Sequence, residues 1–220
     1  MEAKYTSKIG GSDGNDRLSF LPDQIISHIL SFMETKYAVG TAVLSRRLED
    51  LWTRVSNLDL DDAPEWEHAI DEREWQFWRF VDKVLGQHKN LNALSRFRFH
   101  VSVRYNHSFE VLGSTSFKRE LVFGPPIEEI DINIDGGTES GIPQCLRCIP
   151  ENFYTLKNLK VAKLSGVVLG AINLSVFLPS VKILQLSHVK MKDFESLGRL
   201  ISGCPALETL HLETCKLQPF

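Results

Sequence analysis

Residues 178–191, LPSVKILQLSHVKM, contain the pattern that decides the fold of this 220-residue chain. Apolar residues follow one another as apolar-x-x-apolar-x-apolar in VKILQL at 181–186, and the same order recurs in LKVAKL at 159–164 and LETLHL at 207–212. The copies begin 22 and then 26 residues apart, a spacing typical of solenoid repeats. One repeat cannot bury its apolar row alone, whereas parallel neighbours bury it continuously, so the pattern predicts stacked repeats with a parallel β-sheet.

Looser copies of the same pattern precede these three. They lie at 55–60, 94–99 and 127–132, and the spacings up to the next copy are 39, 33 and 32 residues. The longer spacings predict inserts between strands, one of which is an amphipathic helix over about 64–89. Six strands result, and the fold predicted for residues 57–220 is an irregular leucine-rich-repeat α/β solenoid.

The N-terminal part of the chain has a different pattern. Residues 16–56 predict three short helices, with Pro22 in the first turn of the first helix. Thr35 and Ser45 are predicted to cap the second and third helices. Helices this short cannot bury all of their large apolar residues, and the surplus predicts a partner surface. Residues 1–15 are rich in Gly, Ser, Asp and Lys and predict a disordered tail.

Composition excludes several classes of protein. The 25 Lys and Arg nearly balance the 28 Asp and Glu, which disfavours a generic nucleic-acid binder. There is no apolar run of about 18 residues, so no membrane span is expected. The N-terminal residues lack the apolar core of a signal peptide, which predicts a location in the cytoplasm or nucleus. In that reducing setting the four cysteines are expected to be free thiols or metal ligands and not to form disulfides.

No motif for catalysis or metal binding emerges. Cys145 and Cys148 form a CxxC pair, but a structural zinc site needs four ligands and a second such pair is missing. The seven His residues are scattered and form no HExxH motif. Asp59, Asp61 and Asp62 lack the ligand spacing of an EF-hand. We therefore expect no catalytic residues, no metal and no cofactor.

Residues 16–62 resemble the F-box of plant F-box/leucine-rich-repeat proteins, a group that often carries a C-terminal FBD domain. The resemblance rests on Leu21-Pro22, on ISHIL at 26–30, on AVGTAVLSRR at 38–47 and on Leu51-Trp52. The repeat stretches are similar to the same family. No FBD region is recognisable after the sixth predicted strand, as expected of a short family member or of a truncated chain.

The resemblance implies a role without chemistry of its own. F-box proteins usually dock on the Skp adaptor of a cullin–RING ubiquitin ligase, and their repeats hold a target protein. Matching positions imply that a few apolar anchors bind the adaptor. These adaptor contacts are Leu21, Pro22, Ile25, Ile29, Leu30, Val39, Leu44 and Trp52.

The side chains between the apolar positions of each strand are predicted to face the open, concave side of the solenoid, because strand side chains alternate. Candidate target contacts on this side are Arg96, Arg98, His100, Lys163, Gln185 and His211. The first three strands carry acidic, basic and acidic residues in turn. One interpretation is that neighbouring strands neutralise each other through cross-strand pairs. The other is that Arg96 and Arg98 form a cationic hot spot for an acidic target or small ligand.

Three other functions remain as alternatives. A leucine-rich scaffold or decoy would bind targets without engaging ubiquitination, and Leu48, where the family often has Trp, favours it. A ligand-gated co-receptor would need a deep pocket in a longer solenoid than six repeats provide. An enzyme would need a catalytic constellation, which the sequence does not show.

Overall fold

A computed structural model describes residues 20–62, 70–89, 91–102, 124, 126–135, 147–169, 172 and 175–217. Side chains of α4 are described from Gln76 onward. The predicted tail at 1–15, the first part of the predicted helical insert at 64–69, and Cys145 lie outside these residues. None of the described helices is long and apolar enough to cross a membrane.

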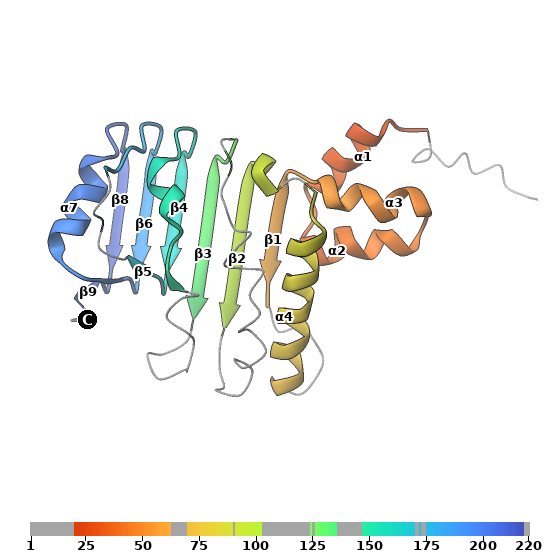
Figure 1. Ribbon diagram of the computed structural model, residues 1–220, viewed down its shortest axis with the longest axis horizontal. Helices are drawn as coiled ribbons and strands as arrows, with labels where there is room; N and C mark the ends of the chain where they lie inside the picture. Colours follow the sequence, from red (N-terminus) through yellow and green to blue (C-terminus); the bar gives the residue numbers. More distant parts are fainter. Residues whose placement is uncertain are drawn as a thin grey trace, which may run out of the picture.

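Six parallel strands form one sheet in the order β1-β2-β3-β4-β6-β8, which confirms the predicted solenoid (Figure 1). Their bounds are β1 Asn57–Asp61, β2 Arg96–Ser102, β3 Glu129–Asp135, β4 Val161–Ser165, β6 Ile183–Ser187 and β8 Thr209–Glu213. Each strand pairs with its neighbour in the register that the repeated pattern predicts. One row across all six strands contains Leu60, Phe99, Ile132, Leu164, Leu186 and Leu212.

A second sheet of very short strands was not predicted from the sequence. It consists of β5 (Val168–Leu169), β7 (Lys190–Met191) and β9 (Lys216–Leu217), each following a turn after a long strand. At those turns Gly166, His188 and Thr214 occupy equivalent positions and have positive φ angles of 68°, 53° and 49°. At Gly166 a Cβ would lie 2.0 Å from the Ile134 carbonyl oxygen, so glycine is required there for space as well as for conformation.

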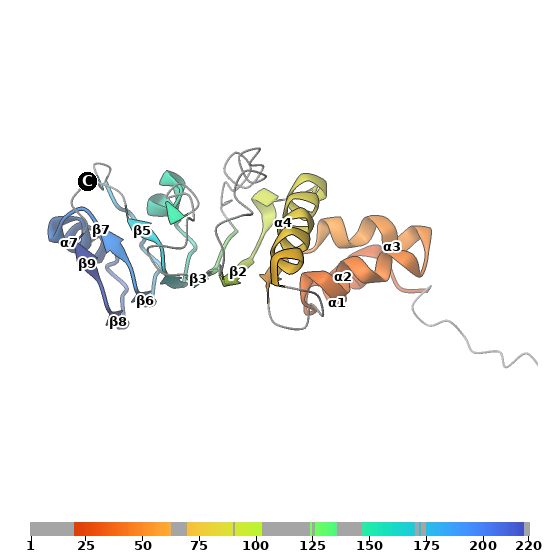
Figure 2. The ribbon, with the colours of Figure 1, turned by 90° about the horizontal axis from the view of Figure 1, so that it is seen from below.

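The described helices lie on one side of the six-stranded sheet, and none of them lies on the other side (Figure 2). The covering elements include α4 (Ile70–Gln87), the short turns η3 (Leu91–Ala93) and η5 (Glu151–Thr155), and α7 (Phe194–Ser202). The Asp193 side chain caps α7 by accepting a 2.6 Å bond from the Ser196 N–H. α4 continues through Gly86 and ends at Gln87. The open side is the concave face that the alternation of side chains predicts.

The first three helices pack against the β1 end of the sheet. They are α1 (Asp23–Leu30), α2 (Thr35–Gly40) and α3 (Arg46–Leu51), with the short turns η1 (Thr41–Val43) and η2 (Trp52–Arg54) after α2 and α3. The Ser45 hydroxyl accepts a bond from the Leu48 N–H and caps α3 as predicted. The prediction for Thr35 is wrong, because Glu34 occupies the N-cap of α2. The Thr35 hydroxyl instead accepts a 2.8 Å bond from the Asp59 N–H and so attaches α2 to β1.

His88 connects the end of α4 to the N-terminal helices. Its ring is buried, and its Nε2–H donates a 3.0 Å bond to the carbonyl of Val55. Burial lowers the pKa of His88, and the bond to the Val55 carbonyl opposes that change only in part. The folded protein therefore holds this imidazole in the neutral form more strongly than the unfolded chain does.

Acid should destabilise the protein through His88. Because its pKa is lower in the folded state, the unfolded chain takes up the proton first as pH falls below about 6.5, and stability is lost until the folded pKa is reached. His88→Gln keeps an N–H donor and removes the titration. Between about pH 7.5 and about pH 5.5 the wild type should lose a few °C more in Tm than this variant. The control is His211→Gln on the surface. Equal pH dependence of wild type and His88→Gln would contradict the assignment.

Candidate functional site

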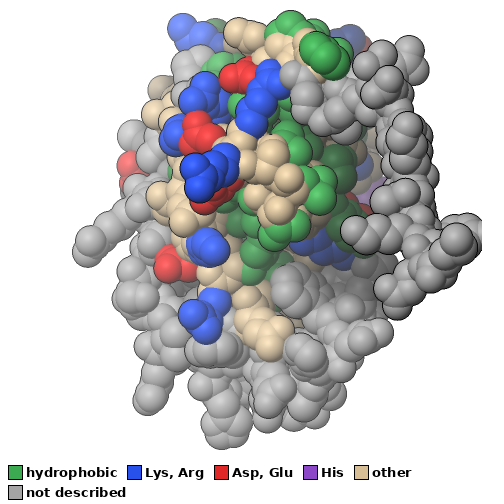
Figure 3. Space-filling view, turned by 90° about the vertical axis from the view of Figure 1, so that its right-hand side faces the viewer, with side chains coloured by type: hydrophobic (Ala, Val, Ile, Leu, Met, Phe, Trp, Pro, Cys, Tyr) green, Lys and Arg blue, Asp and Glu red, His purple; other side chains and the backbone are tan. Residues whose placement is uncertain are grey.

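Exposed apolar side chains concentrate on the N-terminal helices. Of the thirteen large hydrophobic residues that are exposed in the described part of the chain, eight lie between residues 20 and 44. We call these eight the N-terminal apolar surface: Phe20, Ile25, Ile29, Phe32, Met33, Tyr37, Val43 and Leu44. Figure 3 views this end of the molecule, where hydrophobic side chains form a band beside Lys and Arg side chains. An exposed apolar surface of this kind is typical of a protein–protein contact site.

The opposite sides of the same helices hold the surface in place. Ile26, Leu30, Ala38, Leu51 and Trp52 are buried and pack with the first strands. They fix how the three short helices lie relative to one another, so the exposed residues are presented by a packed scaffold.

Arg47 fixes the segment that leads into α1. Its guanidinium donates to the Asp23 carboxylate at 2.6 Å and 2.8 Å, and to the carbonyl of Leu21 at 2.5 Å. These bonds connect α3 to the Leu21-Pro22 step across 24 to 26 residues of sequence. Because this step begins α1, Arg47 also determines where the exposed face of α1 lies.

The eight predicted adaptor contacts separate into three groups. Pro22, Ile25, Ile29 and Leu44 are exposed, and Leu21 and Val39 are half-buried at the edge of the core. Leu30 and Trp52 are 5% and 4% exposed, so in this structure their side chains support the surface from below and do not form it. Five exposed residues that the resemblance did not include are Phe20, Phe32, Met33, Tyr37 and Val43. The sequence did contain a signal for them, because each is a large apolar residue in or beside the short helices and turns of residues 20–44.

The concave face carries a row of paired charges. Arg98 donates to both oxygens of Asp59 at 2.9 Å and 3.1 Å, and to Asp61 at 2.7 Å. It also donates a 3.2 Å bond to His100 Nδ1, and His100 Nε2 in turn donates to Asp131 at 2.8 Å. Ion pairs therefore connect β2 to β1, and the hydrogen bond from His100 connects β2 to β3, as the cross-strand interpretation expects.

The register places the remaining candidate residues near these pairs. Lys163, Gln185 and His211 continue the row that begins with Asp59, Arg98 and Asp131. Arg96 and His100 lie in the rows on either side, and Arg96 pairs with Glu129 at 2.7 Å. The structure thus brings all six predicted target contacts together on one face. Whether they bind a target stays a prediction.

Burial and pairing change the pKa values of these groups in different directions. Burial is the largest influence on Asp59 and raises its pKa, because Arg98 offsets it only in part. Burial also acts on Asp131, but its bond from His100 and the nearby positive charges prevail and lower its pKa. The pKa of Arg98 is raised against the effect of burial, because Asp59, Asp61 and Asp131 surround it. Arg98 is the cation that pairs with both β1 carboxylates, Asp59 and Asp61.

Arg98→Met should therefore destabilise the protein. The change removes the guanidinium that pairs with both Asp59 and Asp61, and the expected loss is about 1–3 kcal/mol, between the values for exposed and buried pairs. The matched control is Arg96→Met, since Arg96 is more exposed and pairs with one carboxylate, so its loss should stay below about 1 kcal/mol. Urea unfolding measures both. If Arg98→Met were as stable as wild type, the ion pairs of Arg98 would not stabilise the fold. That result would favour the interpretation of Arg96 and Arg98 as a cationic hot spot for a ligand or target.

The described residues contain no group of three or more His, Cys, Asp or Glu side chains that could hold a metal ion. Cys148, Cys204 and Cys215 are free thiols in this part of the chain. Burial raises the pKa of Cys204 to about 11, which keeps it in the unreactive thiol form at neutral pH. Cys204 therefore offers no reactive thiolate, and the two surfaces above are the candidate sites.

Comparison with known proteins agrees with both parts of the fold. The F-box domain model matches residues 18–60, and the model described as "FBD-associated F-box protein At5g56370, LRR repeats" matches residues 138–219. F-box/LRR-repeat protein At3g59200 of Arabidopsis thaliana is 33% identical over 204 residues, covering 90% of this chain and 36% of that protein. F-box/FBD/LRR-repeat protein At4g00160 of the same plant is 31% identical over 215 residues, covering 96% of this chain and 44% of that protein.

The chain spans less than half the length of these two relatives. Its similarity to them runs from the helical N-terminal part into the repeats, with the F-box model on the first three helices and the repeat model on the last strands. The chain belongs to the FBD-associated F-box/leucine-rich-repeat family of plants.

Proposed function

We propose that this chain is a substrate-recognition subunit of an SCF-type cullin–RING E3 ubiquitin ligase. The F-box docks on a Skp-type adaptor through the N-terminal apolar surface, and the repeats hold a target protein on the concave face. The observation that carries the proposal is the concentration of exposed apolar residues on the F-box helices, above a packed core. The protein acts in the cytoplasm or nucleus, where its partners are the adaptor and, through it, a cullin.

The chain contributes position and no chemistry. Holding a target near the ubiquitin-loaded enzyme converts a bimolecular encounter into an effectively intramolecular one. The rigid connection between the two surfaces suits this role. Asn57 at the start of β1 donates a 2.9 Å bond to the Ser31 carbonyl after α1, and the Ser56 N–H donates to the Ser31 hydroxyl at 3.1 Å. A target on the sheet is thereby held at a fixed distance from the adaptor.

A second candidate is a scaffold or decoy that binds targets without productive ligase assembly. It is favoured by Leu48, which stands where the family often has Trp and is half-buried against the F-box core. The smaller side chain supplies less area for helix packing, and a less firmly packed F-box docks more weakly.

The ligase subunit and the scaffold can be distinguished by expressing the tagged chain in plant cells, with the proteasome inhibited, and identifying the proteins that it captures. The ligase subunit should capture ubiquitin-conjugated proteins, and these conjugates should disappear in an Ile25→Asp, Ile29→Asp variant that still captures the unconjugated proteins. A scaffold would capture the same proteins with and without the two substitutions, and ubiquitin conjugation would not change between them.

A further inference from the structure

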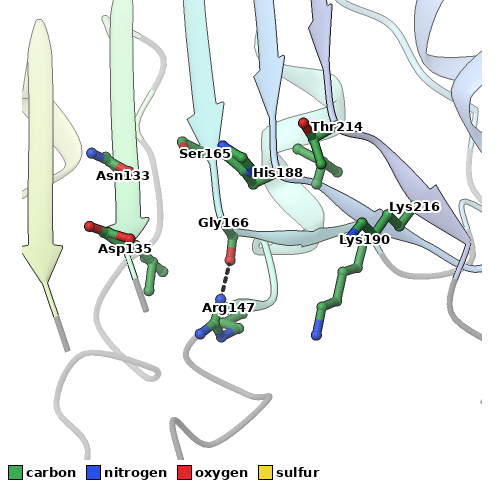
Figure 4. A pocket seen from close by; sticks show the side chains of 11 residues that line it. Asn133, Asp135, Arg147, Ser165, Gly166, His188, Lys190, Thr214 and Lys216 are labelled. Atoms are coloured by element: carbon green, nitrogen blue, oxygen red, sulfur yellow. Dashed lines mark hydrogen bonds between the residues drawn. The ribbon is translucent and has the colours of Figure 1, made fainter. Parts of the chain in front are cut away.

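A hollow of about 570 Å³ opens at the carboxyl ends of β3, β4, β6 and β8. Two of its lining residues, Asn133 and Ser165, continue the row of His100 on the concave face. Three cationic side chains, Arg147, Lys190 and Lys216, line it. Asp135 is the one acidic side chain among its described lining residues. Figure 4 shows these residues around the turns that follow the strands. The charge balance of the described lining is positive, although the chain as a whole carries a net charge of −3.

The repeat geometry places the two lysines opposite one another in neighbouring strands. Lys190 and Lys216 are register partners on the parallel strands β7 and β9, which lie about 4.8 Å apart in such sheets. Like charges directly opposite one another destabilise a sheet. Each lysine follows a turn with a positive φ angle, at His188 and at Thr214, so the backbone fixes where both side chains begin.

Arg147 supplies the third charge from inside the hollow. It is 8% exposed, and its guanidinium donates a 2.8 Å bond to the Gly166 carbonyl, which fixes its position. Burial, together with the charges of Arg147 and Lys216, lowers the pKa of Lys190. Within the described part of the chain, no ion pair involves Lys190 or Lys216. An arrangement that repels itself in this way is stabilised by an anion placed between the cations.

Hydroxyl groups complete the lining. Ser165 and Thr214 carry hydroxyls and also line the hollow, at the end of β4 and in the turn after β8 (Figure 4). Arginine donors in a fixed fork, lysine ammonium groups and hydroxyls together match the oxygens of a phosphate group. We propose that this hollow binds a phosphomonoester or pyrophosphate group, either on a small phosphorylated molecule or on a phosphorylated segment of a protein. The proposal is independent of adaptor docking.

Thermal unfolding of the full chain with inorganic pyrophosphate tests the proposal. At about 100 times its Kd, pyrophosphate should raise Tm by about 5–10 °C relative to NaCl of the same ionic strength. In Lys190→Gln, Lys216→Gln that rise should fall to less than about a fifth. Lys160→Gln, Lys182→Gln is the matched control, since it removes two lysines before β4 and β6, at the opposite edge of the sheet, and should keep the full response.

The Tm measured without pyrophosphate shows whether Lys190 and Lys216 stabilise the fold itself or act only in anion binding. Relief of the repulsion should leave the Tm of Lys190→Gln, Lys216→Gln equal to or above that of wild type. If the double variant does not fold, Lys216→Gln alone serves, because Lys216 is the more exposed of the two. A rise in Tm no larger than that with NaCl, or one that Lys190→Gln, Lys216→Gln retains, would overturn the proposal.

A second arm identifies the source of the phosphate. A labelled phosphoserine peptide and its unphosphorylated twin are compared by fluorescence anisotropy, with pyrophosphate as competitor. Binding of the phosphorylated peptide alone, displaced by pyrophosphate, supports a protein-borne phosphate. If pyrophosphate binds but the phosphorylated peptide does not, the result supports a small phosphorylated molecule as the ligand. Binding of neither overturns the inference.

Discussion

The variant Ile25→Asp, Ile29→Asp should bind a Skp-type adaptor at least about 100-fold more weakly than the wild type. The two isoleucines lie one turn apart on α1 and are 46% and 42% exposed. Truncation of a central apolar anchor costs about 2 kcal/mol or more, and a charge in its place must also be desolvated. Two such losses exceed the about 2.8 kcal/mol that corresponds to a 100-fold change. Titration of purified adaptor into each protein measures the ratio.

The structure offers a matched control for this effect. Phe177→Asp places the same charge on a side chain of similar exposure, 51%, outside the F-box. It should leave adaptor affinity unchanged. All three proteins should unfold at similar temperatures, because each substituted side chain is partly exposed. If the Ile25→Asp, Ile29→Asp variant folded and retained wild-type affinity, the N-terminal apolar surface would not be the docking site.

The second large effect is expected in the core. Phe99→Ala should reduce the free energy of unfolding by about 3–5 kcal/mol, as large-to-small changes at buried aromatic positions do. The Phe99 ring is 1% exposed and lies between Phe97 on β2 and the α4 residues Phe77 and Trp78, with ring centroids 5.9 to 6.4 Å away. Urea unfolding followed by tryptophan fluorescence and by circular dichroism measures the loss.

This aromatic group connects the helical insert to the sheet. Without Phe99, α4 loses its main aromatic contact with β2, so amide hydrogen exchange in α4 should accelerate more than in β6. Phe177→Ala, an exposed aromatic change, should cost no more than about 0.5 kcal/mol. A loss below about 1 kcal/mol for Phe99→Ala would show that α4 is not part of the solenoid core.

The six strands and their register could be predicted from the sequence, because each strand carries one copy of the same apolar pattern and equivalent positions of the copies become neighbours in the sheet. Leu164, Leu186 and Leu212 are equivalent in the pattern and are partners in the sheet. The strands β5, β7 and β9 could not be predicted, because two residues are too few to show a period. Each depends on hydrogen bonds to the neighbouring repeat, as when the Lys190 N–H bonds the Val167 carbonyl.

The candidate surfaces were predicted less completely. Ile25, Ile26, Ile29 and Leu30 make α1 apolar on more than one side, and periodicity alone does not show which side the core takes. The structure buries Ile26 and Leu30 and exposes Ile25 and Ile29. The hollow at the strand ends was missed for another reason. Its lysines lie 26 residues apart and become neighbours only when the repeats stack.

The affinity of the purified chain for a Skp-type adaptor is the measurement that tests the central claim most directly. Isothermal titration should show one adaptor bound per chain with a Kd below about 1 μM, with heat that disappears in the Ile25→Asp, Ile29→Asp variant. A cooperatively folded chain that shows no binding at about 100 μM adaptor would contradict the ligase role and leave the scaffold in its place.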